Sequence, residues 1–397
     1  MNPDPSNLRG TISEDDVARI LGDLVSIPSV NPGHLSTLEQ PFGEASLASY
    51  VEDFARSIGL RSERQEVLPG RDNVLVFLPG AMPNRRLLFE CHMDTVPGWH
   101  GGPDPFVPRV SQGNLYGRGA CDVKGTLAAM LVAFRLLVQQ GWQPSSTLVL
   151  AATVDEEHLA RGVHRLARDG GVADAAVVGE PTEMTAVIAH KGCVRWRLTA
   201  QGKAAHSSRA ELGVNAIESV VELIGTLQQN LVPLLSQRQH PLVGAPSLSV
   251  CTIHGGIAPN VIPDECVVEI DRRTVPGEAT KDVLAEFDSI IQQALLANPS
   301  LRATWQPPFI TDPALGTDPE TPIVRALQRA LSEITGSPTI RGVAFGTDAS
   351  KLSEAGIPSV VFGPGSIEHA HTREEHVSLF DVARAAEVYA HLALTVG

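Results

Sequence analysis

Histidine and carboxylate side chains able to bind a metal ion follow apolar stretches of this sequence. The first pair, His92 and Asp94, lies at the end of the short apolar run that begins at Leu87. Side chains alternate along an extended strand, so these two residues point the same way and the carboxylate can orient the imidazole. An H-x-D triplet also arises by chance, so its interpretation as a metal site depends on residues further along the chain.

Further carboxylates follow two later apolar stretches. The stretch 147–154 leads into Glu156 and Glu157, and the stretch 175–178 leads into Glu180. Ligands of open parallel sheets bind beyond the carboxyl ends of the strands, so these carboxylates are expected near His92. The alternative for the adjacent pair is a solvated turn.

The elements that must position these residues alternate between apolar strands and helices. This order predicts an α/β domain with a mostly parallel sheet covered by helices on both faces. Asp122 precedes a predicted helix at 123–140, where the helix N-terminus favours a carboxylate.

The pattern changes after residue 191. Val194, Trp196 and Leu198 alternate with polar residues, which predicts a half-exposed antiparallel strand. With helices at 214–231 and 281–296, it predicts an inserted α+β domain. The expected domains are a catalytic domain at 1–191, an insert at 192–308 and the rest of the catalytic domain at 309–397.

Composition excludes several classes of function. A chain of 397 residues is expected to form two domains, and its net charge of −14 argues against nucleic-acid or anionic-membrane partners. No stretch is long and apolar enough for a transmembrane helix, and the first residues do not resemble a signal peptide, so a cytoplasmic protein is expected. The five scattered cysteines do not suggest a disulfide framework.

Five ordered blocks of the sequence resemble the M20 metallopeptidases, in the branch of acetylornithine deacetylase and succinyl-diaminopimelate desuccinylase. The blocks are His92-Met-Asp94, Gly119-Ala-Cys-Asp122-Val-Lys-Gly125, Asp155-Glu156-Glu157, Gly179-Glu180-Pro-Thr182 and Ala370-His371-Thr-Arg-Glu-Glu375. The resemblance implies a zinc-peptidase-like catalytic domain, an inserted lid and dimerisation domain, and two divalent metal ions, usually zinc, with cobalt or manganese as alternatives.

The resemblance also implies a role for each residue of these blocks. Asp122 would bridge the two ions, and Glu156 would be the general base. The remaining roles are His92 and Glu180 on one ion, Glu157 and His371 on the other, and Asp94 as the partner of His92.

The insert carries three further residues that the resemblance makes functional. His206, in the block Gly202-Lys-Ala-Ala-His206, would stabilise the oxyanion, commonly across a dimer interface. Asn260 and Arg273 would bind the substrate, with Arg273 pairing its carboxylate and Arg272 as the near competitor. A homodimer through the insert is therefore expected, with the strand at 194–200 as its pairing edge.

The sequence thus predicts a metal-dependent hydrolase that cleaves the amide bond of an N-acyl amino acid by a metal-bound water. Within the same chemistry, the alternative is a dipeptidase or carboxypeptidase acting on a short peptide. Outside the enzyme class, the alternative is a non-catalytic homologue that binds an amino-acid derivative. Such a homologue has no need of Glu156, which is not a metal ligand.

Overall fold

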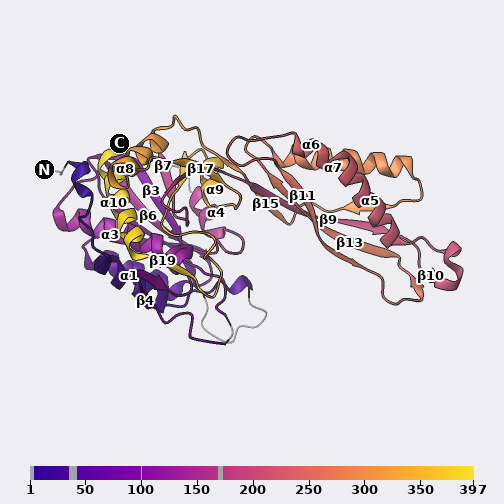
Figure 1. The fold of residues 1–397 in the computed structure, drawn as a ribbon, viewed down its shortest axis with the longest axis horizontal. Coiled ribbons are helices and arrows are strands. Elements are labelled where there is room, and N and C mark those ends of the chain that lie inside the picture. Colours follow the sequence, from indigo (N-terminus) through magenta and orange to yellow (C-terminus); the bar gives the residue numbers. More distant parts are fainter. Residues whose placement is uncertain (1–3, 35–42, 100, 169–172) are drawn as a thin grey trace. The chain divides into compact units, whose positions relative to one another are not determined.

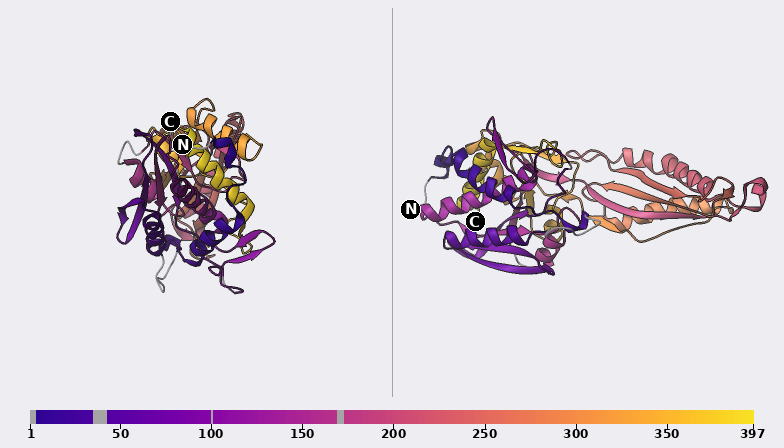
Figure 2. Two further views of the ribbon diagram at one scale, coloured as in Figure 1. Left: turned by 90° about the vertical axis from the view of Figure 1, so that its left-hand side faces the viewer. Right: turned by 90° about the horizontal axis from the view of Figure 1, so that it is seen from below.

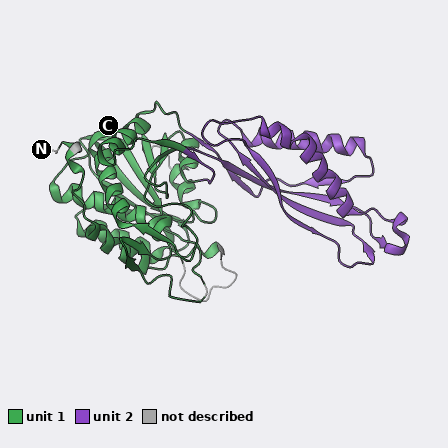
Figure 3. Cartoon of the chain, viewed as in Figure 1, with its two compact units in different colours: residues 1–188, 317–341, 347–397 green, residues 189–316, 342–346 purple. Residues whose placement is uncertain are grey.

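The computed structural model describes residues 4–34, 43–99, 101–168 and 173–397, and the chain divides into two compact units (Figure 3). Unit 1 comprises 1–188, 317–341 and 347–397, and unit 2 comprises 189–316 and 342–346. Unit 2 extends beyond the predicted insert because β15 (Ile310–Asp312) and β16 (Leu315–Gly316) pair with β9 (Gly192–Gln201) and with the end of β8 (Ala186–His190).

The main sheet of unit 1 is mixed, so the prediction of a mostly parallel sheet was wrong. Its order is β1-β2-β6-β3-β7-β18-β8-β16, with β17 (Ile340–Val343) also paired to β8, and the four strands β6, β3, β7 and β18 run parallel to one another. The tight connection between β1 and β2 makes that pair antiparallel, and β2 then pairs antiparallel with β6. The strands besides β8, β16 and β17 are β1 (Arg61–Leu68), β2 (Arg71–Leu78), β3 (Met82–His92), β6 (Ser146–Thr153), β7 (Ala175–Val178) and β18 (Ser359–Val361).

The helices of unit 1 are held by apolar faces. Helix α10 contacts α1, α3 and α8, and α1 also contacts α3. Helices α3 and α10 lie side by side although they are far apart in sequence (Figures 1 and 2). Helix α3 is buried over most of its surface because its sequence is almost entirely apolar. The helices are α1 (Glu14–Ser26), α2 (Ala45–Ser57), α3 (Gly125–Gln140), α4 (Arg161–Arg168), α8 (Pro322–Ile334), α9 (Ala349–Glu354) and α10 (Leu379–Thr395).

The handedness of the crossovers assigns α3 and α4 to opposite faces of the sheet. The connection β3-α3-β6 moves one strand in one direction, and β6-α4-β7 moves back across β3. Because parallel crossovers are right-handed, the reversal of direction places the two helices on opposite faces. Because β3, β6 and β7 are parallel neighbours, their carboxyl ends lie at the same end of the sheet.

Short elements complete unit 1. A small sheet has the order β19-β5-β4. These elements are β4 (Arg109–Ser111), β5 (Asn114–Tyr116), β19 (His376–Ser378), η1 (Pro5–Leu8), η2 (Pro32–His34) and η3 (Ala120–Lys124), and β17 (Ile340–Val343) leads into the second part of unit 2.

Unit 2 is an antiparallel sheet in the order β11-β13-β9-β14, with α5 and α7 packed on one face (Figure 1). Val194, Trp196 and Leu198 are buried as their alternation predicts. However, β9 pairs with β13 on one side and with β14 and β15 on the other, so the prediction that 194–200 is an edge was wrong. Its elements besides β9, β15 and β16 are β10 (Ala205–His206), η4 (Ser207–Leu212), α5 (Ala216–Asn230), α6 (Val232–Ser236), β11 (Ser247–Gly255), β12 (Val261–Ile262), β13 (Glu265–Thr274), α7 (Thr280–Ala297) and β14 (Ala303–Trp305).

Among the residues that the structure describes, no helix has both the length and the apolar character needed to cross a membrane.

Candidate metal centre

His92 ends β3 and is almost fully buried, with 3% of its surface exposed. Its Nδ1 lies 3.0 Å from the backbone oxygen of Asp94, which can only accept a hydrogen bond, so Nδ1 carries a proton. Its Nε2 lies 3.2 Å from Oδ1 of Asp122. Burial lowers the pKa of His92, but the hydrogen bond to Asp122 and the charges of Glu156 and Glu180 outweigh it and raise the pKa well above its usual range.

The carboxylate of Asp94 holds the turn after β6 more closely than it holds His92. Its Oδ1 is 3.7 Å from His92 Nδ1 but accepts the backbone N–H of Glu156 at 3.1 Å. Its Oδ2 accepts the backbone N–H of Glu157 at 3.0 Å and the side-chain amide of Asn31 at 2.7 Å. The backbone of Asp94 thus orients His92, while its side chain positions the two neighbouring glutamates.

Asp122 presents one oxygen to each of two histidines. It lies in η3 with non-helical backbone angles. Helix α3 begins only at Gly125, two residues later than predicted. Oδ1 faces His92, and Oδ2 lies 3.2 Å from Nε2 of His371. Burial opposes ionisation of Asp122, but the hydrogen bonds from His371 and His92 lower its pKa below the usual range. This is the geometry required of a carboxylate that bridges two cations.

Glu157 and Glu180 complete two clusters around Asp122. Glu180 follows β7, and its Oε1 lies 4.0 Å from His92 Nε2, whereas Oε1 of Glu157 lies 3.0 Å from Nε2 of His371. The donor atoms of His92, Asp122 and Glu180, and those of Asp122, Glu157 and His371, each lie within 4.8 Å of one another.

The raised pKa values of the glutamate carboxyl groups in the site indicate crowded negative charge, which bound cations would compensate. Burial, with the nearby charge of Asp122, raises the pKa of Glu180 well above its usual range and raises that of Glu157. Burial also raises the pKa of Glu156 to about 8. Hydrogen bonds to Asp122 and Glu157 raise the pKa of His371, which lies on the loop before β19, to about 10. Several carboxylates at close range are costly unless positive charge compensates them.

The residues present fit divalent metal ions. Imidazole nitrogen and carboxylate oxygen are zinc ligands, and donors about 2.0–2.1 Å from a tetrahedral zinc lie roughly 3.3 Å apart. The closest nitrogen–oxygen separations in the two clusters, 3.0 to 3.2 Å, are near that value. Metal binding would require only small adjustments, apart from the wider separation of 4.0 Å between Glu180 and His92.

The three predicted residues of the insert lie in unit 2, and only two of them are neighbours. His206 is exposed at the end of β10, and the Asn260 carbonyl accepts the N–H of Ser207 at 3.0 Å. Arg273 lies eight positions after Glu265 along β13, roughly 27 Å at 3.4 Å per residue. Arg273 donates to Asp271 at 2.8 Å.

Arg272, the competitor of Arg273, has 1% of its surface exposed and pairs with Glu278 at 2.6 Å. Its guanidinium is therefore committed within unit 2, whereas 35% of the side chain of Arg273 is exposed.

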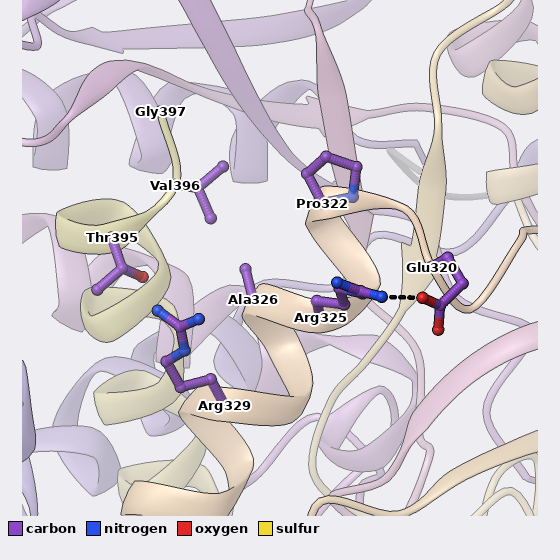
Figure 4. Close-up of a pocket in the computed structure, with 8 residues that line it drawn as sticks. All are labelled: Glu320, Pro322, Arg325, Ala326, Arg329, Thr395, Val396 and Gly397. Atoms are coloured by element: carbon purple, nitrogen blue, oxygen red, sulfur yellow. Dashed lines mark hydrogen bonds and ion pairs between the residues drawn. The ribbon is translucent and has the colours of Figure 1, made fainter.

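The sequence offered no signal for several residues that support the site. Asn31 links Asp94 to Asp155, whose Oδ1 it contacts at 3.1 Å, and Arg71 lies 3.1 Å from the same oxygen. These contacts join positions many residues apart, and no local pattern reveals them. A pocket of unit 1, of about 340 Å³, contains none of the predicted residues (Figure 4). It is lined by Glu320, Pro322, Arg325, Ala326, Arg329, Thr395, Val396 and Gly397.

Two histidine and carboxylate clusters that share one aspartate, beyond the carboxyl ends of central parallel strands, are features of a metallohydrolase. The sequence profile of Peptidase family M20/M25/M40 matches residues 88–395, and the chain belongs to this family. It is a metal-dependent amidohydrolase.

Curated relatives and solved structures resemble the chain over nearly all of its length. Acetylornithine deacetylase of Myxococcus xanthus is 31% identical over 352 residues, covering 87% of this chain and 90% of the relative. A probable succinyl-diaminopimelate desuccinylase of Staphylococcus epidermidis is 28% identical, covering 92% and 94%. The crystal structure of aminopeptidase PepT from Bacillus cereus superposes with a TM-score of 0.80 at 20% identity, covering 97% of this chain and 99% of that one.

Proposed function

We propose that this protein hydrolyses the amide bond of an N-acyl amino acid, as a deacetylase or desuccinylase, with Glu156 as general base. The observation that carries the proposal is Asp122, whose two oxygens face His92 and His371 from different segments of the chain. The relatives named acetylornithine deacetylase and succinyl-diaminopimelate desuccinylase support this class of substrate.

In this proposal two divalent ions, zinc with cobalt or manganese as alternatives, occupy the two clusters. His92 and Glu180 would hold one ion, Glu157 and His371 the other, and Asp122 both. When bound, such ions polarise the amide carbonyl and lower the pKa of the attacking water. The five donors supply three negative charges at most, so an additional anion such as hydroxide is electrostatically favoured.

Glu156 has the properties of a base that works near neutral pH. It belongs to neither ligand cluster, and in the metal-free chain burial raises its pKa to about 8. Cations in the two clusters would lower this pKa toward the neutral range, where a group can take a proton and later return it. Asp94 fixes its backbone N–H, so its carboxylate starts from a defined position. Glu156 would remove the proton of the attacking water and donate it to the leaving amine.

His206 is proposed as the donor that stabilises the oxyanion. Its Nδ1 accepts the backbone N–H of Ser208 at 3.2 Å and lies 2.8 Å from the hydroxyl oxygen of the same residue, so Nε2 is the ring nitrogen left to donate. An N–H on Nε2 is the donor that this role requires.

The proposed substrate residues also favour a homodimer. His206 and Asn260 are neighbours, whereas Arg273 lies on β13 eight positions beyond Glu265, roughly 27 Å along that strand. A small substrate cannot contact all three residues in one copy of unit 2. If all three bind substrate, two copies must contribute, which supports the proposed dimer through unit 2.

Two alternatives remain for the same chain. A dipeptidase or carboxypeptidase would use the same clusters on a short peptide. The aminopeptidase named above has the same fold, but at 20% identity this likeness concerns the fold alone. A non-catalytic binding protein would keep the clusters without needing a base, so the presence of Glu156, which joins neither cluster, argues against it. The cytoplasmic location stays a prediction from the sequence.

The test is turnover of a small panel by protein loaded with zinc or cobalt. The panel contains N-acetylornithine, N-succinyl-diaminopimelate, several N-acetyl amino acids and two dipeptides, and Glu156→Ala is measured beside wild type. The matched control is Glu374→Gln, which changes an exposed glutamate near His371.

We expect an N-acyl amino acid to be cleaved by wild type and by the control, and activity to disappear in Glu156→Ala while about two ions stay bound. Cleavage of the dipeptides alone would favour the peptidase alternative. Undiminished activity of Glu156→Ala would refute its role as base, and a wild-type protein without metal affinity would refute the whole proposal.

A further inference from the structure

We propose that the buried ion pair of Arg118 and Glu375 positions the metal ligands by holding together three segments of the chain that carry these ligands. We call this ion pair, with its backbone contacts, the clasp. Glu375 was part of a sequence block that resembles the family, but the proposed chemistry gives it no role. The inference rests on the proposed function, because it concerns the two ions that Asp122 would bridge, one of which His371 would also hold.

The carboxylate of Glu375 holds the backbone of the bridging aspartate. Its Oε1 accepts the N–H of Cys121 and the N–H of Asp122, both at 3.1 Å. Two donors on one carboxylate oxygen restrict the peptide planes on either side of Cys121. The direction in which Asp122 projects its side chain therefore depends on where Glu375 lies.

Glu375 also belongs to the loop of His371, only four residues away. Its backbone oxygen accepts the N–H of Gly117 at 3.1 Å, so main chain and side chain both attach this loop to the segment before α3. His371 is half-exposed, with 48% of its side chain accessible, and its backbone angle φ is +61°. A loop of this kind needs an anchor to keep its imidazole near Asp122.

Arg118 extends the clasp to the third segment. Its guanidinium pairs with Oε2 of Glu375, and its Nε donates to the backbone oxygen of Pro97 at 3.1 Å. Pro97 follows the His92–Asp94 segment closely. One guanidinium thus connects the end of β3, the Asp122 segment and the His371 loop, which between them supply three of the five ligands.

The burial of the pair makes it an effective positioning device. Arg118 has 3% and Glu375 has 1% of its surface exposed. Charge-assisted hydrogen bonds are short and directional, and inside a protein they are not screened by solvent. Partners of metal ligands commonly change metal affinity by about 10- to 100-fold when they are replaced.

The consequence should differ between the two clusters. In the cluster with His371, Glu375 is linked to both Asp122 and His371. In the cluster with His92, Glu375 is linked to Asp122 alone. His92 is held separately by the backbone of Asp94. Weakening the clasp should therefore reduce the affinity of the cluster with His371 more than that of the cluster with His92.

The experiment measures bound Co²⁺ by equilibrium dialysis for full-length wild type, Glu375→Gln and His371→Ala. Dialysis over a range of free Co²⁺ gives both dissociation constants, and His371→Ala identifies the constant that belongs to the cluster with His371. Free Co²⁺ tenfold above that constant keeps this site about 90% filled in the wild type. A 10- to 100-fold loss of affinity would lower its occupancy to between about one half and one tenth. In Glu375→Gln the dissociation constant of the cluster with His371 should therefore rise 10- to 100-fold, whereas that of the cluster with His92 should change less.

The matched control is Glu387→Gln on α10. Glu387 is also a fully buried carboxylate that accepts a backbone N–H, from Ile12 at 3.1 Å, and pairs with Arg384 at 2.9 Å, but no predicted ligand takes part. It should keep two ions even where its melting temperature falls as far as that of Glu375→Gln.

Two results would overturn the inference. One is normal binding of both ions by Glu375→Gln, and the other is an equal loss of both ions, which a general structural defect would cause. Should Glu375→Gln fail to fold, Arg118→Lys takes its place, since it keeps the charge but loses the forked geometry. Unchanged affinity for both ions in that variant would also refute the clasp. A wild-type chain that binds fewer than two ions would instead refute the proposed function.

Discussion

Replacing Asp94 by asparagine should separate catalysis from metal binding. The carboxylate accepts three N–H groups, from Glu156, Glu157 and Asn31. An asparagine has one oxygen, which can serve Glu157 and Asn31 if it takes the place of Oδ2. Its amide NH₂ then faces the N–H of Glu156, so one hydrogen bond to a charged group is lost and one donor is left without an acceptor.

The size of the effect follows from these contacts. A hydrogen bond to a charged group contributes about 1.5–3 kcal/mol, so Asp94→Asn should lower the free energy of unfolding by about 2 kcal/mol. A displacement of the base by about 1 Å costs roughly 100-fold in rate. We therefore expect kcat to fall about 100-fold, with KM changed little. The backbone of Asp94, which orients His92, is unchanged, so the metal content should stay near two ions per chain.

The assay is steady-state kinetics on the substrate identified by the panel, with metal content determined on the same samples. Asp174→Asn is the control, because Asp174 also accepts a backbone N–H, from Arg86 at 2.8 Å, but 46% of its side chain is exposed. If Asp94 acted chiefly through His92, the loss of activity would follow the loss of metal and extra metal would restore it. That result, or an unchanged kcat, would refute this reasoning.

Three further predictions concern pH, the core of unit 2 and the oxyanion. The raised pKa values of Glu156 (about 8) and His371 (about 10) mean that these two groups hold more protons in the folded metal-free chain than in the unfolded chain. They lower the stability as pH rises from about 4.5 to 10, whereas Lys124, whose pKa burial lowers to about 7, acts in the opposite direction above pH 7. The stability of the metal-free chain should therefore fall between about pH 4.5 and 7, and Zn²⁺ binding at pH 8 should release protons, as calorimetry in buffers of different ionisation enthalpy would detect. Trp196 is fully buried against Phe287, and its Nε1 has no acceptor among the residues that the structure describes. Trp196→Ala should therefore cost about 3–5 kcal/mol in denaturant unfolding, and Trp196→Phe distinctly less. Equal costs would contradict this. His206→Ala should lower kcat by about 10²–10³-fold at constant metal content, and an unchanged kcat would exclude it as the oxyanion donor.

Local sequence was informative where one short segment decides the outcome. The alternation of Val194, Trp196 and Leu198 predicted a strand with one buried face, because residues two apart share a face of a sheet. The order of the histidine and carboxylate blocks predicted the family, which the comparison with known proteins confirms.

Other features depended on pairings between distant segments. The sheet is mixed, although its central strands are parallel, because β2 and β8 join it antiparallel. Strand β9 is internal because β14 and β15, about a hundred residues later, occupy its free side. Sequence periodicity reports which face of a strand is buried, but it contains no record of which strand lies beside it.

The sequence by itself determined the chemistry available at the centre: two imidazoles, several carboxylates and the strand ends that carry them. Only the tertiary structure decided that Asp122 offers one oxygen to each histidine, and that Asp94 holds the backbone of Glu156 rather than chiefly the ring of His92. Only it joined Arg118 to Glu375, 257 positions apart. Residue types and spacing specify which groups can bind or react, whereas distances between groups far apart in the chain are set by the packing of the whole unit.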